Sequence, residues 1–280
     1  SCSAAAAAPP ARTLGRTLGG EKPEKPAAHI DDVDIVLYQY AICPFCNKVK
    51  AVLDFYGLRY RTVEVNPLNK AELKDESAIQ TDYRKVPLAT IDGEIVTDSP
   101  VILRRVLSLL EDRGIATKTQ GEGSGGSDEE WMQWVDKSLA VLLFPNITRN
   151  FPESWQAFSY IADVERFSVV QRGLNRVLGP VAMWAAQGKI KKKYDIDDER
   201  AALFDALYAW ADAVDASASD FVGGDTPSVA DLCVFGCIRA IDGLDTHTEV
   251  VTDPRIRTWY DAMVEAVGAS SNLEKTGNAY

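Results

Sequence analysis

The sequence is short of basic residues and of long apolar runs, and each shortage excludes a class of protein. Among 280 residues, 30 lysines and arginines stand against 41 aspartates and glutamates, which gives a net charge of −11 at neutral pH. Nucleic-acid-binding proteins carry a basic footprint, so we expect no nucleic-acid partner. The apolar runs fall short of the roughly 20 residues that a membrane-spanning helix needs. We therefore expect a soluble protein without a transmembrane segment, and a small molecule as its substrate.

Cysteine is also scarce, with five residues in the chain. An odd number at irregular spacing does not suit the disulfide framework of a secreted protein and indicates a reducing compartment. Two of the five are nevertheless close together, in Cys43-Pro44-Phe45-Cys46, directly after a strand-like segment. This CxxC can be a redox pair, half of a metal site or a turn with two structural thiols. Its place at the start of a βαβ unit favours the redox pair.

Acidic residues and a periodic apolar face are missing from the start of the chain. Residues 1–20 contain two arginines and no acidic residue, and residues 1–28 are rich in alanine, proline and glycine. This composition is typical of the end of an organelle transit peptide, although a flexible linker has a similar one. We assign residues 1–32 to a flexible targeting remnant or linker, and expect a chloroplast or mitochondrial location.

Strand patterns are confined to the first half of the chain, in residues 33–115. Apolar alternation and helical spacing there predict the order β-α-β-α-β-β-α, which requires a mixed sheet. Asp92-Gly93 is the strongest hairpin signal. For the helix that follows the hairpin, we expect Ser99 as N-cap and Pro100 as the first residue. The segments expected to form these elements include 33–41, 47–57, 59–66, 67–76 and 99–114.

The second half of the chain lacks strand patterns and internal repeats. Residues 116–127 have the composition of a flexible Gly/Ser linker. Helical spacing then predicts an all-α domain over 128–270, and residues 271–280 form a tail. The expected fold class is α/β followed by all-α. The expected helices cover residues 128–143, 155–178, 180–190, 197–219, 227–243 and 253–268.

The helix expected at 227–243 is apolar almost all round, which is typical of a helix buried at the centre of a domain. Ser228 and Asp231 at its start form an acidic variant of the capping box. Cys233 and Cys237 lie four residues apart on it and are expected in the core as small apolar residues. A zinc site at the CxxC would have to recruit these cysteines, or His29 and His247, from distant segments.

Several motifs in this order resemble the prostaglandin E synthase type 2 family, within the glutathione transferase superfamily. The similarity runs from about residue 33 to 265. It implies a thioredoxin-like (glutaredoxin-like) domain that binds glutathione, followed by a helical domain of the glutathione transferase type. The family's animal members carry a hydrophobic N-terminal anchor, and we expect none in this chain. The motifs are LYQYAICPFCNKVKAVLDF, VEVNP, YRKVP and ADLCVFGCIRAIDGLD.

The CxxC supplies the candidate catalytic residues. We expect Cys43 just before a helix, where free backbone N–H groups and the positive end of the helix dipole favour the thiolate. Cys46, one turn further in, can resolve a mixed disulfide. Tyr40 ends the preceding strand, and its hydroxyl can donate to the thiolate or to a substrate, or simply cap a packed aromatic ring.

The resemblance also implies a glutathione site. A cis peptide bond between Val86 and Pro87 would let the Val86 backbone pair with the extended tripeptide. Asp98 would bind the ammonium of glutathione, and Ser99 would bind its γ-glutamyl carboxylate at the start of a helix, which is a natural anion site.

The resemblance further implies isomerisation of the prostaglandin H endoperoxide to prostaglandin E, with glutathione as cofactor and a homodimer as the assembly. A general glutathione transferase or thiol-transferase reaction would use the same residues. Haem bound with glutathione, an iron–sulfur cluster shared between subunits at Cys43, and a non-catalytic scaffold are the alternatives. No metal is assigned to the site.

Overall fold

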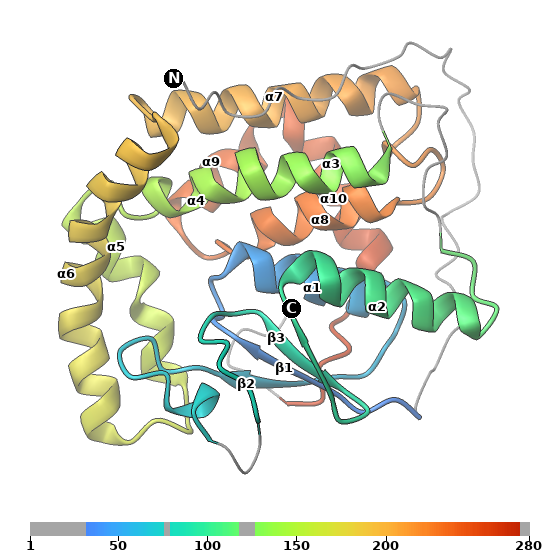
Figure 1. Ribbon diagram of the computed structural model, residues 1–280. Coiled ribbons are helices and arrows are strands. Elements are labelled where there is room, and N and C mark those ends of the chain that lie inside the picture. Colours follow the sequence, from blue (N-terminus) through green and yellow to red (C-terminus); the bar gives the residue numbers. More distant parts are fainter. Residues whose placement is uncertain (1–31, 76–78, 118–126, 275–280) are drawn as a thin grey trace.

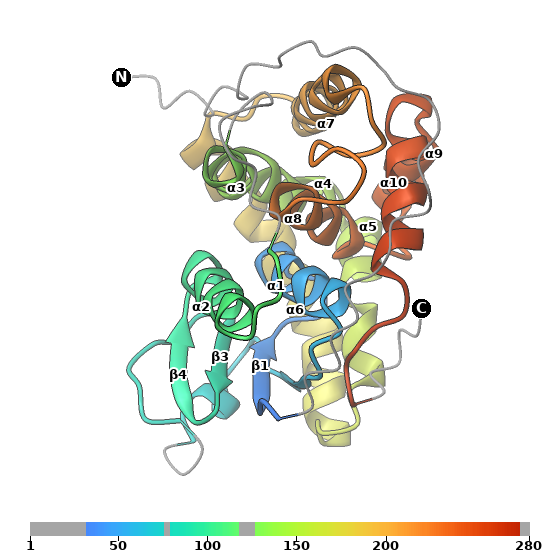
Figure 2. The same ribbon diagram turned by 90° about the vertical axis from the view of Figure 1, so that its right-hand side faces the viewer.

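The structure is a computed structural model that describes residues 32–75, 79–117 and 127–274. It has three layers, with a small sheet, two helices that cover it and a larger group of helices beyond them (Figures 1 and 2). The predicted targeting segment and most of the predicted Gly/Ser linker lie outside the described residues. The domain boundaries at the linker therefore stay predictions.

The sheet has four strands in the order β2-β1-β3-β4. β1 runs parallel to β2 and antiparallel to β3, and β3 and β4 form the expected hairpin. Its turn places Asp92 and Gly93 at φ of 50° and 83°, a backbone conformation that Asp-Gly adopts readily. The α/β half of the predicted fold is confirmed. The strands are β1 (Ile35–Gln39), β2 (Arg61–Glu64), β3 (Leu88–Ile91) and β4 (Glu94–Thr97).

Two helices cover one face of this sheet, α1 (Pro44–Phe55) and α2 (Ser99–Asp112). The apolar residues that predicted α1 by their spacing are all buried: Val49, Val52, Leu53 and Tyr56. Gly57 follows the helix at a φ of 67°, as a C′ glycine does. The segment 67–76 departs from the prediction, because it holds only a 3₁₀ turn, η1 (Ala71–Leu73). Lys70 before it takes a left-handed φ of 52°, which prevents a regular α-helix.

Every regular element that the structure describes in the second half is a helix, and the β pairing there is limited to isolated bridges. The predicted all-α character is confirmed. The segment expected as one helix over 128–143 contains a π-helical stretch, η2, in its middle. A short helix at 245–252 was absent from the prediction. The elements are α3 (Asp128–Trp134), η2 (Val135–Leu139), α4 (Ala140–Asn146), α5 (Phe151–Ala157), η3 (Ser159–Asp163), α6 (Val169–Tyr194), α7 (Glu199–Ser217), α8 (Val229–Arg239), α9 (Asp245–Thr252) and α10 (Pro254–Val267).

Helix α6 corrects the largest error of the sequence prediction. Helices are expected over 155–178 and 180–190, but residues 164–168 are not helical. The helix α6 then runs through Pro180 without a break and is 26 residues long. Proline costs the helix a hydrogen bond. Gly179 and Pro180 are both buried here, and a Cβ atom on Gly179 would lie 2.0 Å from the Phe158 ring. The helix begins behind a capping box of Ser168 and Gln171, a signal that the sequence contains.

Helix α8 occupies the centre of the helical half, and each of its residues from Val229 to Ile238 is buried. The predicted capping box is present, since Ser228 Oγ accepts from the Asp231 N–H at 3.3 Å and Asp231 accepts from the Ser228 N–H at 2.9 Å. The Asp231 carboxylate also accepts from the indole N–H of Trp259 at 3.0 Å. These bonds satisfy a buried charge and fix the start of α8.

Helices α1 and α8 join the two halves of the molecule. They approach so closely that a Cβ atom on Gly236 would lie 2.5 Å from the Lys48 Cα and 2.6 Å from the Asn47 carbonyl oxygen. Only glycine allows this approach. The helix that carries the CxxC is therefore packed directly on the central helix of the second half.

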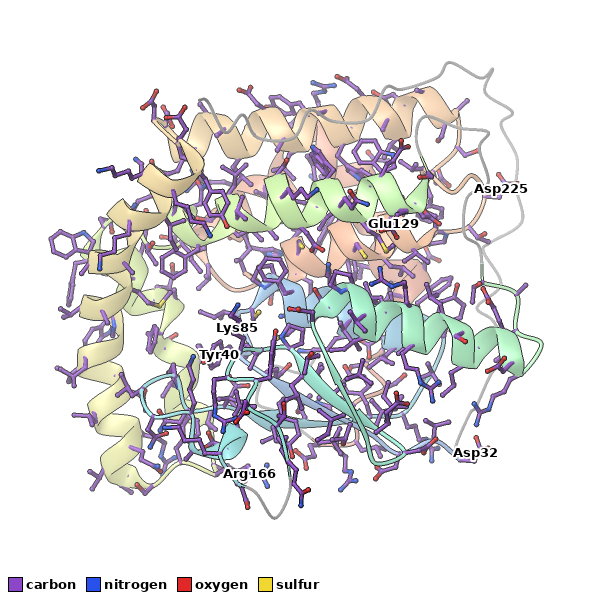
Figure 3. The ribbon with its side chains drawn as sticks, in the orientation of Figure 1. Asp32, Tyr40, Lys85, Glu129, Arg166 and Asp225 are labelled. Carbon is purple, nitrogen blue, oxygen red and sulfur yellow. The ribbon has the colours of Figure 1, made fainter. Side chains whose placement is uncertain are left out.

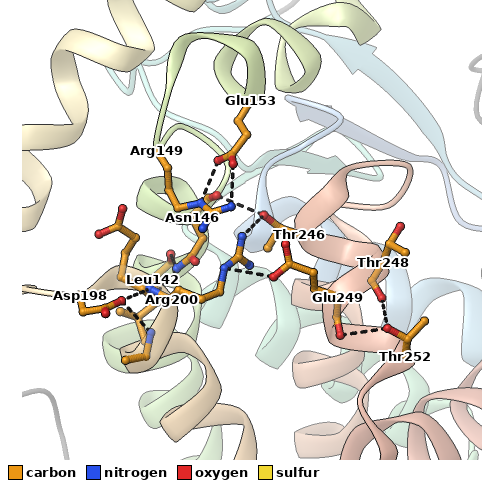
Figure 4. Close-up of polar contacts among 12 residues, drawn as sticks. Leu142, Asn146, Arg149, Glu153, Asp198, Arg200, Thr246, Thr248, Glu249 and Thr252 are labelled. Carbon is orange, nitrogen blue, oxygen red and sulfur yellow. Dashed lines mark hydrogen bonds and ion pairs between the residues drawn. The ribbon is translucent and has the colours of Figure 1, made fainter.

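A polar cluster in the helical half connects three helices, the end of α4, the start of α7 and α9 (Figure 4). The Asn146 side chain donates to the Glu199 carbonyl at 2.7 Å, and Thr246 donates to the Asn146 carbonyl at 3.1 Å. Arg200 donates to the Thr246 hydroxyl at 3.1 Å and pairs with Glu249 at 3.4 Å. These bonds join the end of α4 to the start of α7 and to α9, and they give partners to buried polar groups.

Candidate functional site

Cys43 lies at the junction of β1 and α1, as the N-cap residue of the helix, in an extended conformation with φ of −81° and ψ of 118°. Pro44 is in the first turn of the helix. Cys43 is partly exposed, whereas Cys46 is fully buried one turn along, and neither forms a disulfide. The placement expected from the sequence is thus observed, with one accessible and one inaccessible sulfur.

The two thiols have opposite pKa shifts. A hydrogen bond from the Cys46 thiol, helped by the backbone N–H groups of Cys46 and Phe45, lowers the pKa of Cys43. Burial raises the pKa of Cys46 well above that of an ordinary thiol, and the neighbouring Cys43 sulfur adds to the rise. A thiolate is the nucleophilic form of cysteine. The environment therefore favours charge on the accessible sulfur.

Four hydrogen bonds hold the turn that carries Cys43. Its backbone N–H donates to the Tyr40 carbonyl at 3.0 Å. The Asn47 side chain reaches back from α1 and donates to the carbonyls of Ala41 at 2.6 Å and Cys43 at 3.0 Å. The fourth comes from the Ala41 N–H, which donates to Glu64 at 2.8 Å. The sulfur is therefore presented by a turn with little conformational freedom.

Tyr40 lies at the end of β1 beside this turn (Figure 3). Burial, followed by the two cysteines, raises the pKa of Tyr40 to about 12. The hydroxyl is consequently protonated throughout the physiological range and can act as a hydrogen-bond donor, as the sequence analysis expects.

The strand register brings the predicted glutathione residues to the same end of the sheet. Tyr38 is opposite Leu88 and Leu88 is opposite Thr97. One residue further along each strand, Pro87 and Asp98 come beside the end of β1 that leads into the CxxC. The Val86–Pro87 peptide bond is cis, as expected.

Asp98 is the N-cap residue of α2, and Ser99 is its first helical residue, which corrects the expected N-cap by one position. Asp98 has a φ of 67°, which is rare for a residue with a side chain and is often found at functional sites. Its exposed carboxylate accepts a hydrogen bond from the Tyr83 hydroxyl at 2.7 Å. Ser99 is buried beneath it.

Sequence reasoning missed three side chains next to the site. Burial and the hydrogen bond to Asp98 raise the pKa of Tyr83, and the charges of the two cysteines add to the rise. Lys48 is fully buried two residues after Cys46 and forms an ion pair with Asp136 of η2. Glu64 is bound to the Ala41 N–H. All three lie inside motifs that carry the family resemblance, but the sequence analysis assigned them no role. A charged residue at a buried helix position such as Lys48 is itself a signal.

The structure gives no second set of ligands for a metal at the CxxC. Within residues 32–75, 79–117 and 127–274, no three His, Cys, Asp or Glu side chains are arranged to hold a metal ion. Cys233 and Cys237 are buried in α8. Burial raises the pKa of Cys233 to about 12, so it stays a neutral thiol. The prediction that both cysteines belong to the core is confirmed.

Comparison with known proteins places these features in a family. Residues 37–114 match the glutathione S-transferase N-terminal domain. The chain is 31% identical to prostaglandin E synthase 2 of Danio rerio over 87% of this chain and 74% of the relative. Mouse prostaglandin E synthase 2 is 30% identical with the same coverage. This chain belongs to the prostaglandin E synthase 2 family.

A solved structure supports the fold at lower sequence identity. A glutathione transferase of Phanerochaete chrysosporium superposes with a TM-score of 0.54 at 18% identity, and the match covers 84% of this chain and 97% of the other. The family assignment and this likeness confirm the predicted combination of a thioredoxin-like domain with a helical glutathione-transferase-type domain. No described helix is long and apolar enough to cross a membrane.

Proposed function

We propose that this prostaglandin E synthase 2 family member is a glutathione-dependent enzyme with Cys43 as its nucleophile. The observation that carries the proposal is the convergence of three features at one end of the sheet: the accessible low-pKa thiol, the cis Val86–Pro87 segment and the Asp98 carboxylate at the start of α2. Family membership makes the prostaglandin H endoperoxide the first substrate to test.

The charged groups of glutathione are complementary to the groups at this end of the sheet. The γ-glutamyl ammonium pairs with the exposed Asp98 carboxylate, which the Tyr83 hydroxyl orients at 2.7 Å. The γ-glutamyl carboxylate lies at the N-terminus of α2, where the positive end of the helix dipole attracts an anion. The cysteinyl amide group pairs with the Val86 backbone. Bound in this way, glutathione extends toward Cys43.

The isomerisation requires no net oxidant or reductant. The Cys43 thiolate bonds to one oxygen of the endoperoxide, the O–O bond breaks, and the released oxygen takes a proton to become a hydroxyl. A base then removes the hydrogen from the ring carbon that bears the sulfur-bound oxygen. A C=O bond forms, the S–O bond breaks and its electron pair returns to sulfur. Glutathione assists and is not consumed, as covalent catalysis by a regenerated nucleophile allows.

Calorimetry on Asp98→Ala tests the pocket. Loss of a hydrogen bond to a charged group costs about 1.5–3 kcal/mol, so we expect glutathione affinity to fall tenfold or more. Asp112→Ala, at the exposed far end of the same helix, is the matched control and keeps full affinity. Unchanged affinity of Asp98→Ala would reject the pocket.

Turnover tests the reaction separately from binding. Wild-type protein and Cys43→Ser are incubated with the endoperoxide and glutathione, and the prostaglandin E product is measured by mass spectrometry against a protein-free blank. We expect the Cys43→Ser variant to match the blank. A wild-type protein that binds glutathione but only matches the blank would leave a transferase or thiol-exchange reaction, or a scaffold role. In the described residues no three His, Cys, Asp or Glu side chains are arranged to hold a metal ion, and a haem- or iron–sulfur-binding role stays the alternative.

We further propose that the protein is a homodimer formed through α6. The outward face of this helix is apolar, with seven large side chains between 47% and 78% exposed. It lies at the edge of the molecule, and no other described element covers it (Figure 1). A face of this size on a soluble protein marks an interaction site. The exposed residues are Val169, Val170, Leu174, Val177, Leu178, Val181 and Trp184.

A second copy suits this face by symmetry and charge. The apolar residues are centred near Val177 and Val181, so a two-fold axis there pairs the stripe with itself. The helix contains no acidic residue and ends in a lysine cluster. An antiparallel arrangement brings the exposed Lys192 and Lys193 of one copy toward the exposed Glu165 that precedes α6 in the other.

Sedimentation velocity tests the dimer. We expect wild-type protein to sediment as a dimer and Val177→Glu to sediment as a monomer, because a buried unpaired carboxylate is costly. Val264→Glu changes an equally exposed valine on α10 and keeps the dimer. A monomeric wild-type protein at micromolar concentration would overturn the assignment.

The organelle location stays a proposal that rests on the composition of residues 1–32. Import of a tagged full-length precursor into isolated chloroplasts and mitochondria checks it, and a precursor that neither organelle imports would reject it.

A further inference from the structure

A buried glutamate lies under the turn that presents Cys43. Glu64 is the last residue of β2, opposite Gln39 in β1, and is 6% exposed. No arginine or lysine forms an ion pair with it in the part of the chain that the structure describes. A carboxylate that is buried without a cation is costly unless hydrogen bonds compensate it. Such a group calls for an explanation.

Three donors from three segments converge on this carboxylate. The Ala41 N–H donates to Oε1 at 2.8 Å, and the Gln39 side-chain amide donates to Oε2 at 3.1 Å. The Tyr160 hydroxyl donates from η3 in the helical half. The carboxylate thus joins the strand before the CxxC, the CxxC turn itself and the second half of the molecule.

The connection from Glu64 to the nucleophile is short. Glu64 holds the Ala41 N–H, and the Ala41 carbonyl accepts from Asn47, which also donates to the Cys43 carbonyl. Loss of the acceptor at Glu64 would leave the Ala41 N–H without its partner and loosen the turn from below.

The charges around Glu64 show what its ionisation does. Burial raises the pKa of Glu64 to about 7, against the Ala41 N–H, the charge of Lys50 on α1 and the bonds from Gln39 and Tyr160. Its negative charge in turn opposes the lowering of the Cys43 pKa and adds to the raised pKa of Cys46 and of Tyr40. Glu72 of η1 is the other nearby carboxylate and acts on Tyr40. Glu64 therefore changes charge in the physiological range next to a thiol that must itself become charged.

We propose that Glu64 is a positioning residue for Cys43 with two separable effects: its hydrogen bond to Ala41 fixes the turn, and its charge opposes thiolate formation as the pH rises. This inference concerns the nucleophile assigned under the proposed function, and it needs neither glutathione nor an endoperoxide to be tested.

Two substitutions separate the two effects. Glu64→Gln keeps an oxygen for the Ala41 N–H and removes the charge. The Gln39 amide can rotate to meet the new NH₂ group, because its Oε1 atom is buried and has no partner in the native structure. Glu64→Ala removes both the charge and the acceptor. Glu72→Gln is the control, because its carboxylate accepts from the Asn66 N–H at 2.8 Å and not from the CxxC turn.

The measurement is the rate of Cys43 alkylation by iodoacetamide from pH 5 to 9, with the modified peptide identified by mass spectrometry. For Glu64→Gln we expect the Cys43 midpoint to move to lower pH by half a unit or more, about a threefold gain in thiolate below the midpoint. For Glu64→Ala we expect the same direction of shift, but a plateau rate changed at least threefold from that of Glu64→Gln. Glu72→Gln keeps the wild-type profile.

The outcomes decide the two effects independently. A Glu64→Gln profile that superposes on wild type overturns the role of the charge. Equal plateau rates for Glu64→Ala and Glu64→Gln overturn the role of the hydrogen bond. A wild-type Cys43 that reacts normally in this assay while glutathione fails to bind would reject the proposed function and leave the role of Glu64 intact.

Discussion

Arg239 on α8 donates to Asp54 on α1 at 2.8 Å, and the pair joins the two halves of the molecule behind the CxxC helix. The Asp54 side chain is fully buried, and that of Arg239 is 14% exposed. Asp54 also accepts from the Tyr60 hydroxyl at 3.1 Å and from the backbone N–H of Ser271 at 2.8 Å. The buried Asp54 carboxylate on α1 thus contacts α8, the residue before β2 and the segment that follows α10.

The first prediction concerns this pair. Removal of one partner from a buried ion pair leaves an uncompensated charge and costs about 3–5 kcal/mol, so Arg239→Met should lower the free energy of unfolding by that amount. Arg61→Met removes an exposed pair with Asp34, whose side chains are 48% and 65% exposed, and should cost at most about 1 kcal/mol. Urea denaturation measures both. Similar losses for the two variants would show that the pair does not hold the halves together.

The second prediction concerns the close approach of α1 and α8. Gly236→Ala places a methyl group 2.5 Å from the Lys48 Cα, so the helices must separate, and overpacking of this kind costs about 1–3 kcal/mol. Gly188→Ala on α6 meets nothing within 4 Å and should stabilise the protein by up to about 1 kcal/mol through helix propensity. Opposite signs in urea denaturation are expected. A neutral Gly236→Ala would contradict the observed packing.

The third prediction is a pH dependence of stability. The folded state raises the pKa of Glu64 from 4.5 to about 7, so between these values the folded protein binds a proton that the unfolded chain has released. The contribution of this proton to the free energy of unfolding is fully present below pH 4.5. It is lost as the pH rises through about 7, and the free energy of unfolding falls by up to about 3 kcal/mol. Glu64→Gln lacks this loss and should gain stability relative to wild type between pH 5 and 8.

The measurement is the free energy of unfolding of wild type and Glu64→Gln at pH 5 and pH 8. A difference between the two proteins that is the same at both pH values would mean that Glu64 has an ordinary pKa. Glu72→Gln, for which no such gain is expected, controls for a general effect of removing a carboxylate.

The sequence predicts the helices and strands that depend on local patterns. The prediction fails where contacts between distant segments determine the structure. The spacing around α1 and the capping box of Ser228 and Asp231 were sufficient to place both helices, because the signals lie within a few residues of one another. Pro180 misled the prediction, because the helix is packed at this point against a distant segment, with Gly179 against Phe158, which the local sequence does not reveal.

The same distinction applies to the site. Cys43, Asp98 and the cis Pro87 follow from motifs. Glu64 and Tyr83 lie inside the VEVNP and YRKVP motifs, but their roles arise only when β2 and the segment before β3 are brought beside the CxxC turn. The N-cap of α2 was predicted one residue too late, because the sequence does not reveal that Asp98 takes a positive φ before the helix.

The last prediction assigns the two thiols. Cys43 is partly exposed and its pKa is lowered, whereas Cys46 is fully buried and its pKa is raised. Iodoacetamide at neutral pH should therefore label Cys43 first, and the Cys43→Ser variant should lose fast labelling and all thiol-dependent turnover.

Cys46→Ser should keep a reactive Cys43 but lose dithiol exchange, leaving reactions in which glutathione resolves the mixed disulfide. Because the Cys46 thiol donates the bond that most lowers the Cys43 pKa, and a serine hydroxyl can donate in its place, Cys46→Ala should raise the alkylation midpoint of Cys43 more than Cys46→Ser does. Alkylation profiles and steady-state kinetics on the three variants provide the test. Activity in Cys43→Ser together with an inactive Cys46→Ser would reverse the assignment, and full activity in both would move the chemistry away from the CxxC.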